Sequence, residues 1–309
     1  MLESAVSIVV VMFMLIAVGY LSQHYGWLGA NAQTLLSRLT LRIGVPGLVF
    51  SNMLTNYTRD MLLSGAAQLV VPLGVMTITY VLSKWIAGWL KIPKERIGIF
   101  RALFTFANCM FVGLPICVAI FGEQATSIVL YYYLVNTIFW WVIGAPAVAR
   151  DGGSTAQGPL RRLVSPPLIA VAVSLACVLL GVRPPEVLLR TAAFLGNLVT
   201  PLSMLFIGCT LCTMVAQGLR WEKGYAMILI GRFLIAPALC LPLCFALGLT
   251  GDALGVFFLQ SGMPSQTQTC LWAQEHHADA GYAAGAIALT TLLGLVVVPL
   301  QTWLLTFLG

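Results

Sequence analysis

Long apolar runs, separated by short polar or turn-forming segments, extend through nearly the whole chain. A helix that crosses a bilayer needs roughly 20 predominantly apolar residues. On that basis the pattern predicts ten spans, near residues 5–22, 36–55, 62–89, 97–121, 125–148, 166–181, 190–216, 224–248, 253–273 and 280–308. Such an arrangement leaves no room for a separate soluble domain between the spans.

Two of these spans carry residues that interrupt a helix. The fourth contains Asn108 followed by Gly113-Leu114-Pro115, which predicts a break near Gly113–Pro115, since proline removes a backbone donor and glycine lowers the cost of leaving helical geometry. The ninth contains Gly262-Met263-Pro264. Amides and hydroxyls surround that second motif at Gln260, Ser261, Ser265, Gln266, Thr267, Gln268 and Thr269.

The two motifs lie 149 residues apart (264 − 115), about half the chain. Paired interrupted spans in corresponding halves indicate the substrate site of a transporter, although a simple proline kink remains the alternative for each alone. Five spans in each half place the halves in opposite orientations. The chain therefore reads as an inverted repeat with halves 1–150 and 159–309, joined by the polar segment 150–167.

Composition agrees with a multi-pass membrane protein: 60% of residues are hydrophobic, 8% are charged, and the mean hydropathy is +0.95. The net charge of +6 comes from basic residues scattered between apolar runs, which excludes a nucleic-acid partner and suits membrane orientation. Thirteen of sixteen Lys and Arg residues (16 − 3) fall on one side if both termini are outside, and only Arg59, Arg183 and Arg190 on the other. We expect the inner, cytoplasmic membrane of a cell, with Met1–Tyr20 retained as the first span.

No acidic residue falls at the middle of a predicted span, which argues against a carboxylate-mediated proton step and against a cationic substrate. An anion fits better, because the amino ends of broken helices attract negative groups. Asn108 and Gln268 can donate to it, and Asn52, Gln68 and Asn136 are further polar residues, each equally suited to joining two helices. Arg42, Arg101 and Arg232 are expected to reach the cytoplasmic surface. The eight cysteines lie in apolar segments and predict neither a disulfide framework nor a metal site.

The stretch Ala107 to Ile116, with its Asn-x-x-x-x-Gly-Leu-Pro pattern, resembles the auxin efflux carrier family, which includes the plant PIN carriers and many bacterial carriers. Met263-Pro264-Ser265-Gln266 and the run from Ala273 to Pro299 are similar to that family's ninth and tenth spans. The resemblance covers essentially the whole chain. It departs at Gln68, the nearest position to a functional aspartate of plant members.

The resemblance implies an all-α membrane protein of ten transmembrane helices in two inverted five-helix repeats, in which broken helices 4 and 9 cross. It further implies a dimer-forming scaffold from 1–55 and 166–216, and a transport domain from 60–148 and 222–309 that moves as an elevator. Its bacterial members are linked to malonate, malate and similar acids. The resemblance makes Asn108 a substrate-contacting amide and makes Pro115 and Pro264 the prolines at which the helices cross. Together with the polar residues of the spans, the predicted substrate-contacting set is Asn52, Gln68, Asn108, Gly113, Pro115, Asn136, Gln260, Ser261, Pro264, Ser265, Gln266, Thr267 and Gln268.

These observations lead us to expect a secondary transporter of small organic carboxylate anions, without catalytic residues and without a cofactor. A sodium-coupled importer, similar to bile acid sodium symporters, is one alternative, with sodium held by Gln260, Ser261, Gln266 and Thr267. A membrane-embedded sensor of small acids is another, and a membrane enzyme is disfavoured because no nucleophile–base pair is evident.

Overall fold

The computed structural model describes residues 2–29, 31–122, 124–153, 166–216 and 221–305. These residues are helical over most of their length and contain no β-strand. Each of the ten predicted apolar ranges is mostly helical where it is described, and the fourth and ninth are each divided by a short non-helical segment. Most of the segment predicted to join the two halves, residues 154–165, lies outside the described ranges.

The first half consists of helices that are often divided by short π or 3-10 turns, labelled η. They are α1 (Leu2–His24), α2 (Ala32–Leu39), η1 (Thr40–Gly44), α3 (Val45–Asn56), α4 (Arg59–Ser64), η2 (Ala66–Leu69), α5 (Val70–Trp89), η3 (Lys94–Arg96), α6 (Ile97–Thr105), η4 (Cys109–Gly113), α7 (Leu114–Phe121), α8 (Ala125–Phe139), η5 (Trp140–Gly144) and α9 (Ala145–Asp151).

The second half is built in the same manner. Its elements are α11 (Pro166–Leu180), α12 (Glu186–Asn197), α13 (Val199–Ala216), α14 (Tyr225–Ile230), η6 (Gly231–Ile235), α15 (Ala236–Ala246), α16 (Gly251–Ser261), α17 (Gln268–Glu275) and α18 (Ala280–Leu305).

Membrane-length apolar helices are present in both halves. Among the described residues, four helices are long and apolar enough to cross a bilayer: Ala66–Trp89, Ala125–Asp151, Glu186–Thr213 and Tyr225–Ala246. The bent pair Ala280–Gly294 and Val296–Leu305 makes a fifth if it is counted as one span. That all ten ranges cross the membrane remains a prediction.

A π turn followed by an X-Pro pair occurs four times. The prolines Pro46, Pro115, Pro146 and Pro237 are each the second residue after η1, η4, η5 and η6, respectively. A proline lacks a donor and crowds the carbonyl four residues before it, and the wider π turn relieves that crowding. The helix therefore continues through each of these prolines.

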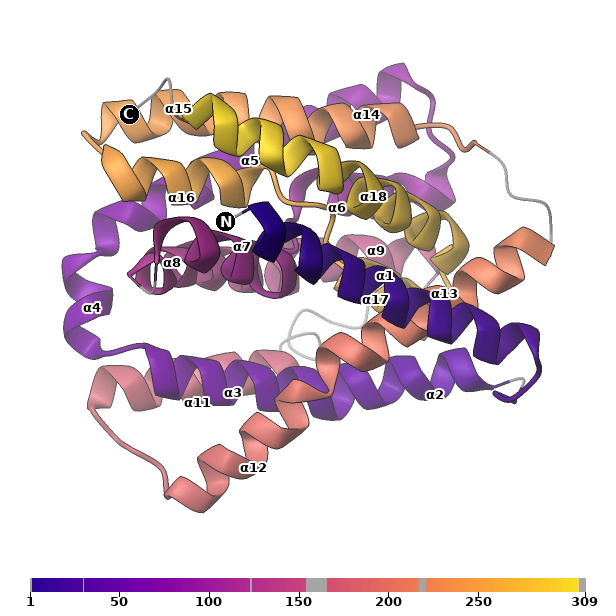
Figure 1. The fold of residues 1–309 in the computed structure, drawn as a ribbon, viewed down its shortest axis with the longest axis horizontal. Helices are drawn as coiled ribbons and strands as arrows, with labels where there is room; N and C mark the ends of the chain where they lie inside the picture. Colours follow the sequence, from indigo (N-terminus) through magenta and orange to yellow (C-terminus); the bar gives the residue numbers. More distant parts are fainter. Residues whose placement is uncertain (1, 30, 123, 154–165, 217–220, 306–309) are drawn as a thin grey trace.

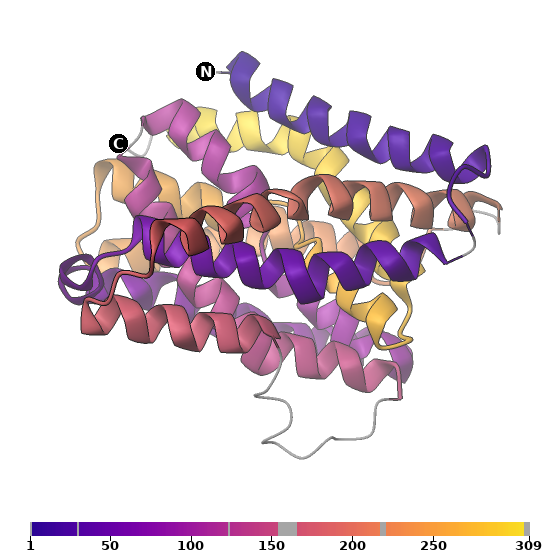
Figure 2. The ribbon, with the colours of Figure 1, turned by 90° about the horizontal axis from the view of Figure 1, so that it is seen from below.

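The helices form two groups with a third set between them (Figure 1). The helices α2, α3, α11 and α12 run along one side, where α3 packs against both α11 and α12. The helices α5, α14, α15 and α16 lie on the opposite side, and α6, α7, α8, α9 and α17 lie between. Figure 2 shows α1 across the outside of the molecule, where it packs against α13. The predicted division into scaffold and transport domains stays a prediction.

Small residues allow α1 and α13 to approach closely. A Cβ at Gly208 would overlap the carbonyl oxygen of Ile16, and one at Gly19 would overlap the carbonyl of Leu205. The thiol of Cys209 also donates to the carbonyl oxygen of Gly19 at 3.4 Å. This packing follows the small-residue pattern by which helices associate in membranes.

Gly208→Ala is expected to lower the thermal midpoint of the purified protein. The added methyl meets main-chain atoms that cannot turn away, so overpacking costs about 1–3 kcal/mol, more than the roughly 1 kcal/mol that alanine gains in helix propensity. Gly88→Ala is the matched control, because nothing lies within 4 Å of a Cβ there. An equal midpoint for both variants in a thermal-shift assay would contradict the packing account.

Candidate functional site

The fourth apolar range is broken at Phe106–Asn108. Helix α6 ends at Thr105, Phe106 is extended (φ −87°, ψ 132°), and η4 begins at Cys109. The predicted break at Gly113–Pro115 is therefore wrong. Gly113 closes η4 and Pro115 is the second residue of α7, where the preceding π turn lets the helix continue.

The ninth apolar range is broken where the sequence predicts it. Helix α16 ends at Ser261 and α17 begins at Gln268, which leaves Gly262–Thr267 between two half-helices. Met263, Pro264 and Ser265 all lie in this non-helical segment. The segment is fully buried, so its main-chain groups depend on partners elsewhere in the protein.

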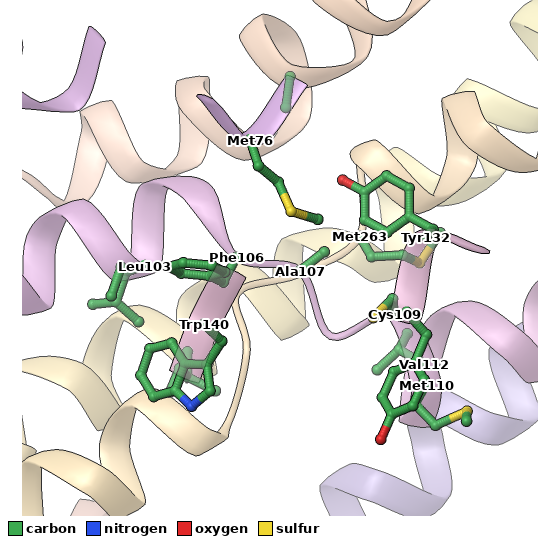
Figure 3. Packing of buried hydrophobic residues seen from close by; sticks show 14 of the residues in the cluster. Met76, Leu103, Phe106, Ala107, Cys109, Met110, Val112, Tyr132, Trp140 and Met263 are labelled. Atoms are coloured by element: carbon green, nitrogen blue, oxygen red, sulfur yellow. The ribbon is translucent and has the colours of Figure 1, made fainter. Parts of the chain in front are cut away.

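The two breaks meet and supply those partners to each other. Ala107 and Ser265 form an isolated antiparallel bridge. The main-chain N–H of Asn108 donates to the carbonyl of Pro264 at 2.8 Å, and the N–H of Gln266 donates to the carbonyl of Phe106 at 3.1 Å. Figure 3 shows Phe106 and Ala107 on the chain between two helical segments, with Met263 nearby. The two broken helices therefore cross, and the crossing satisfies backbone that lipid would leave unpaired.

Asn136 on α8 pairs with the remaining main-chain groups of Ala107. Its Oδ1 accepts from the N–H of Ala107 at 3.3 Å, and its Nδ2 donates to the carbonyl of Ala107 at 3.5 Å and to Oε1 of Gln266 at 3.4 Å. The side chain is 2% exposed. The Asn136 side chain thus pairs with the main chain of Ala107 as a neighbouring strand would. Asn136 is one of the residues predicted for the site.

Arg232 lies at the same place, contrary to the expectation that it reaches the surface. It is 0% exposed, and it donates from Nη1 to the carbonyl of Thr105 at 2.7 Å and from Nη2 to the carbonyl of Ser261 at 2.8 Å. Nε and Nη2 also reach the carbonyl of Met263, at 3.0 and 2.9 Å. The Arg232 side chain does not extend to the membrane surface, because the carbonyl groups at the two helix breaks lack helical donors and accept hydrogen bonds from it instead.

The other two arginines lie nearer the surface. Arg42 is exposed and pairs with Glu275, and the guanidinium of Arg101 lies 3.8 Å from the ring centroid of Tyr80. Among the described residues, Arg232 is the one charged side chain that is buried. The crossing therefore contains a fixed positive charge and no carboxylate within the described part of the chain.

Asn108 presents an unpaired donor at the start of a half-helix. It is 3% exposed and is the N-cap of η4, yet its Nδ2 has no hydrogen-bond partner. The crossing also adjoins the amino ends of η4 and α17, and at α17 the N–H groups of Thr269 and Cys270 donate to the carbonyls of Gln266 and Thr267, at 3.3 and 3.1 Å. Buried polar groups are rarely left unpaired, so the Asn108 amide is suited to a ligand acceptor.

Most of the remaining predicted residues lie at or beside the crossing, and two lie on other helices. Gly113 lies against Gln260, whose Nε2 donates to the thiol of Cys117 at 3.5 Å. Nε2 of Gln266 donates to Oε1 of Gln268 at 2.6 Å. Oε1 of Gln260 and Oγ1 of Thr267 are buried without partners. Of the other residues predicted for the site, Ser261, Pro264 and Ser265 belong to the crossing, whereas Asn52 on α3 accepts from Asn56 and Gln68 lies in η2.

The main omission from the predicted site is Arg232. Its sequence signal is its depth, since it lies well inside the apolar run 224–248, with apolar residues or glycine for several positions on both sides. An ionisable residue at such a depth is by default a functional residue with a partner.

Comparison with known proteins covers nearly the whole chain. The profile of a family described as membrane transport protein matches residues 4–302. An uncharacterized transporter of Methanocaldococcus jannaschii is 25% identical over 307 residues, which cover 96% of this chain and 98% of that protein. An uncharacterized transporter of Methanothermobacter thermautotrophicus is 26% identical over 303 residues, 96% of each chain.

Proposed function

The chain belongs to the membrane transport protein family, the auxin efflux carriers that its sequence resembles, and on that premise we propose that it carries small organic carboxylate anions. The family and both relatives are transporters, so the protein is a membrane transporter and not an enzyme. The substrate class, the driving force and the movement are our proposals.

The unpaired Asn108 amide beside two helix amino ends is the observation that carries this proposal. Each amino end bears roughly half a positive charge, and helix amino ends are common binding sites for anions. A carboxylate placed between η4 and α17 would lie in the positive field of both amino ends and would accept a hydrogen bond from Nδ2 of Asn108. The absence of a buried acid among the described residues suits an anion better than a cation.

The driving force would be the membrane potential. An inside-negative potential favours anion exit by about 2.3 kcal/mol per charge per 100 mV. We propose an elevator movement in which the crossing travels with α4–α9 and α14–α18 against a dimeric scaffold of α1–α3 and α11–α13. Exposed apolar residues on α12, Val187 and Phe194 at 76% and 75%, supply a face for a second subunit or for lipid.

Contacts between the proposed transport helices and the proposed scaffold helices would have to break during that movement. Glu275 at the end of α17 pairs with Arg38 on α2 at 3.4 Å and also with Arg42. The hydroxyl of Ser37 donates to the carbonyl of Leu271 at 2.9 Å. The ion pairs are partly exposed and cost little to break. The buried Ser37–Leu271 bond and the packing of α2 on α17 and of α13 on α18 would have to separate as well.

The test is flux in proteoliposomes. Vesicles loaded with labelled malonate, malate or an aromatic acid should lose label faster when valinomycin and a potassium gradient impose a potential that drives anion exit. Reversing the gradient should slow the loss. Protein-free vesicles set the background, and equal loss from both preparations for every acid would reject carboxylate transport.

Sodium coupling is the second candidate, favoured by Oε1 of Gln260 and Oγ1 of Thr267, two buried oxygens without partners. Such oxygens are ligands for hard cations. Replacing sodium by potassium on both sides of the vesicle membrane tests this version. Unchanged flux would exclude it, and flux that requires sodium would replace potential-driven export by import.

A further inference from the structure

The carboxyl ends of the two broken helices converge at one side chain. Thr105 is the last residue of α6 and Ser261 is the last residue of α16, and Arg232 donates to both carbonyls. Each helix carboxyl end carries roughly half a negative charge, so the two together amount to about one. A single guanidinium balances that charge. The positive ends of η4 and α17 are then left uncancelled.

Arg232 has little capacity left for a substrate. A guanidinium has five N–H donors, and four hydrogen bonds already run from Arg232 to three main-chain carbonyls. At most one N–H is free, and the planar fork is held in place from three directions. Its charge therefore acts on the protein backbone and not on a bound anion.

Local structure places Arg232 at this point. It lies in the π turn η6, and a Cβ at the preceding Gly231 would overlap the ring of Phe104 on α6. The opposite end of α6 is also matched in charge, since both carboxylate oxygens of Asp151 accept from the N–H groups of Gly98 and Ile99, at 3.0 and 2.8 Å. Both ends of this half-helix thus have a partner of opposite sign.

We propose that Arg232 is a positioning residue: its guanidinium clamps and neutralises the two carboxyl ends at the crossing, so that the amino ends keep their geometry and field for the anion. The effect on transport rests on the proposed function, whereas the clamp itself does not. Removing the side chain leaves the carbonyls of Thr105, Ser261 and Met263 converging on a site of guanidinium size.

The test is chemical rescue of Arg232→Ala by free guanidinium. The variant is expected to melt at a lower temperature and to lose at least about tenfold in carboxylate flux, because hydrogen bonds from a charged donor are stronger than those between neutral groups. Guanidinium chloride at low millimolar concentration, present from solubilisation onward, should raise its melting temperature and restore flux several-fold. Wild-type protein and Asn136→Leu, treated identically with sodium chloride at equal ionic strength as the salt control, should show no gain.

A folded Arg232→Ala protein that ignores guanidinium, or one that melts and transports as wild type does, would overturn the proposal. Arg232→Lys guards against a failure to fold. Its compact ammonium keeps the charge and lacks the fork, so we expect reduced flux and reduced thermal stability. Wild-type values for this variant would also overturn the clamp.

The melting measurements need no substrate and therefore separate the two proposals. Should the wild-type protein carry no carboxylate, guanidinium-dependent melting of Arg232→Ala would still support the clamp. Normal carboxylate flux in Arg232→Ala would leave the proposed function intact and reject the role of Arg232.

Discussion

Asn108→Ala is expected to lower carboxylate flux by roughly tenfold to a hundredfold while the protein stays folded. The side chain contributes an unpaired donor that bonds only to a ligand, and a hydrogen bond to a charged acceptor contributes about 1.5–3 kcal/mol. The main-chain N–H of residue 108 still reaches Pro264 in the variant, so the crossing persists. Initial rates of carboxylate flux in proteoliposomes measure the effect, and an unchanged melting temperature shows that the variant is folded.

Asn52→Ala is the matched control for this variant. Asn52 was also predicted to contact substrate, but its Oδ1 accepts from Asn56 on α3, away from the crossing contacts. We expect its flux to equal that of the wild type. Undiminished flux in folded Asn108→Ala would remove Asn108 from the site, and a loss in Asn52→Ala alone would move the site toward α3.

Asn136→Leu is expected to destabilise the protein by about 2–6 kcal/mol. Leucine is similar in size, but it leaves both the N–H and the carbonyl of Ala107 buried without partners, at about 1–3 kcal/mol each. Flux should fall as well, because Ala107 adjoins Asn108. Denaturation in mild detergent and flux in proteoliposomes measure the two effects.

The comparison for that variant is Asn56→Leu, which removes one partly buried side-chain bond of 3.3 Å. Its stability should change by less than about 1 kcal/mol, as is typical of partly exposed polar residues. Similar losses from both substitutions would show that Asn136 is an ordinary polar contact between helices and not a support of the crossing.

The helical ranges could be predicted from the sequence, and the first break could not. An apolar run of membrane length has few conformations open to it besides a helix, so the positions of the helices can be predicted from the sequence. The pattern Gly-x-Pro misled at Gly113 because the chain also carries it at Gly44 and Gly144, where a π turn precedes the proline and the helix continues. Only at Gly262 does it mark a true interruption.

The actual break at Phe106–Asn108 has no strong local signal. It is maintained by contacts from distant parts of the chain: the bridge to Ser265, the Asn136 amide and the Arg232 guanidinium. Residue type alone could not separate Asn136 from Asn52 either, because composition does not show which face of a helix turns toward a neighbour. Tertiary contacts decide both questions.

The four π turns have a consequence for reading this chain beside its relatives. Each accommodates one residue more than an α-helical turn, and one residue corresponds to about 100° of rotation at 3.6 residues per turn. A relative without the extra residue would show a single-residue gap there, with every later side chain of that helix facing elsewhere. An alignment that slips by one position near Gly231 would therefore assign the wrong amino acid to the place that Arg232 occupies.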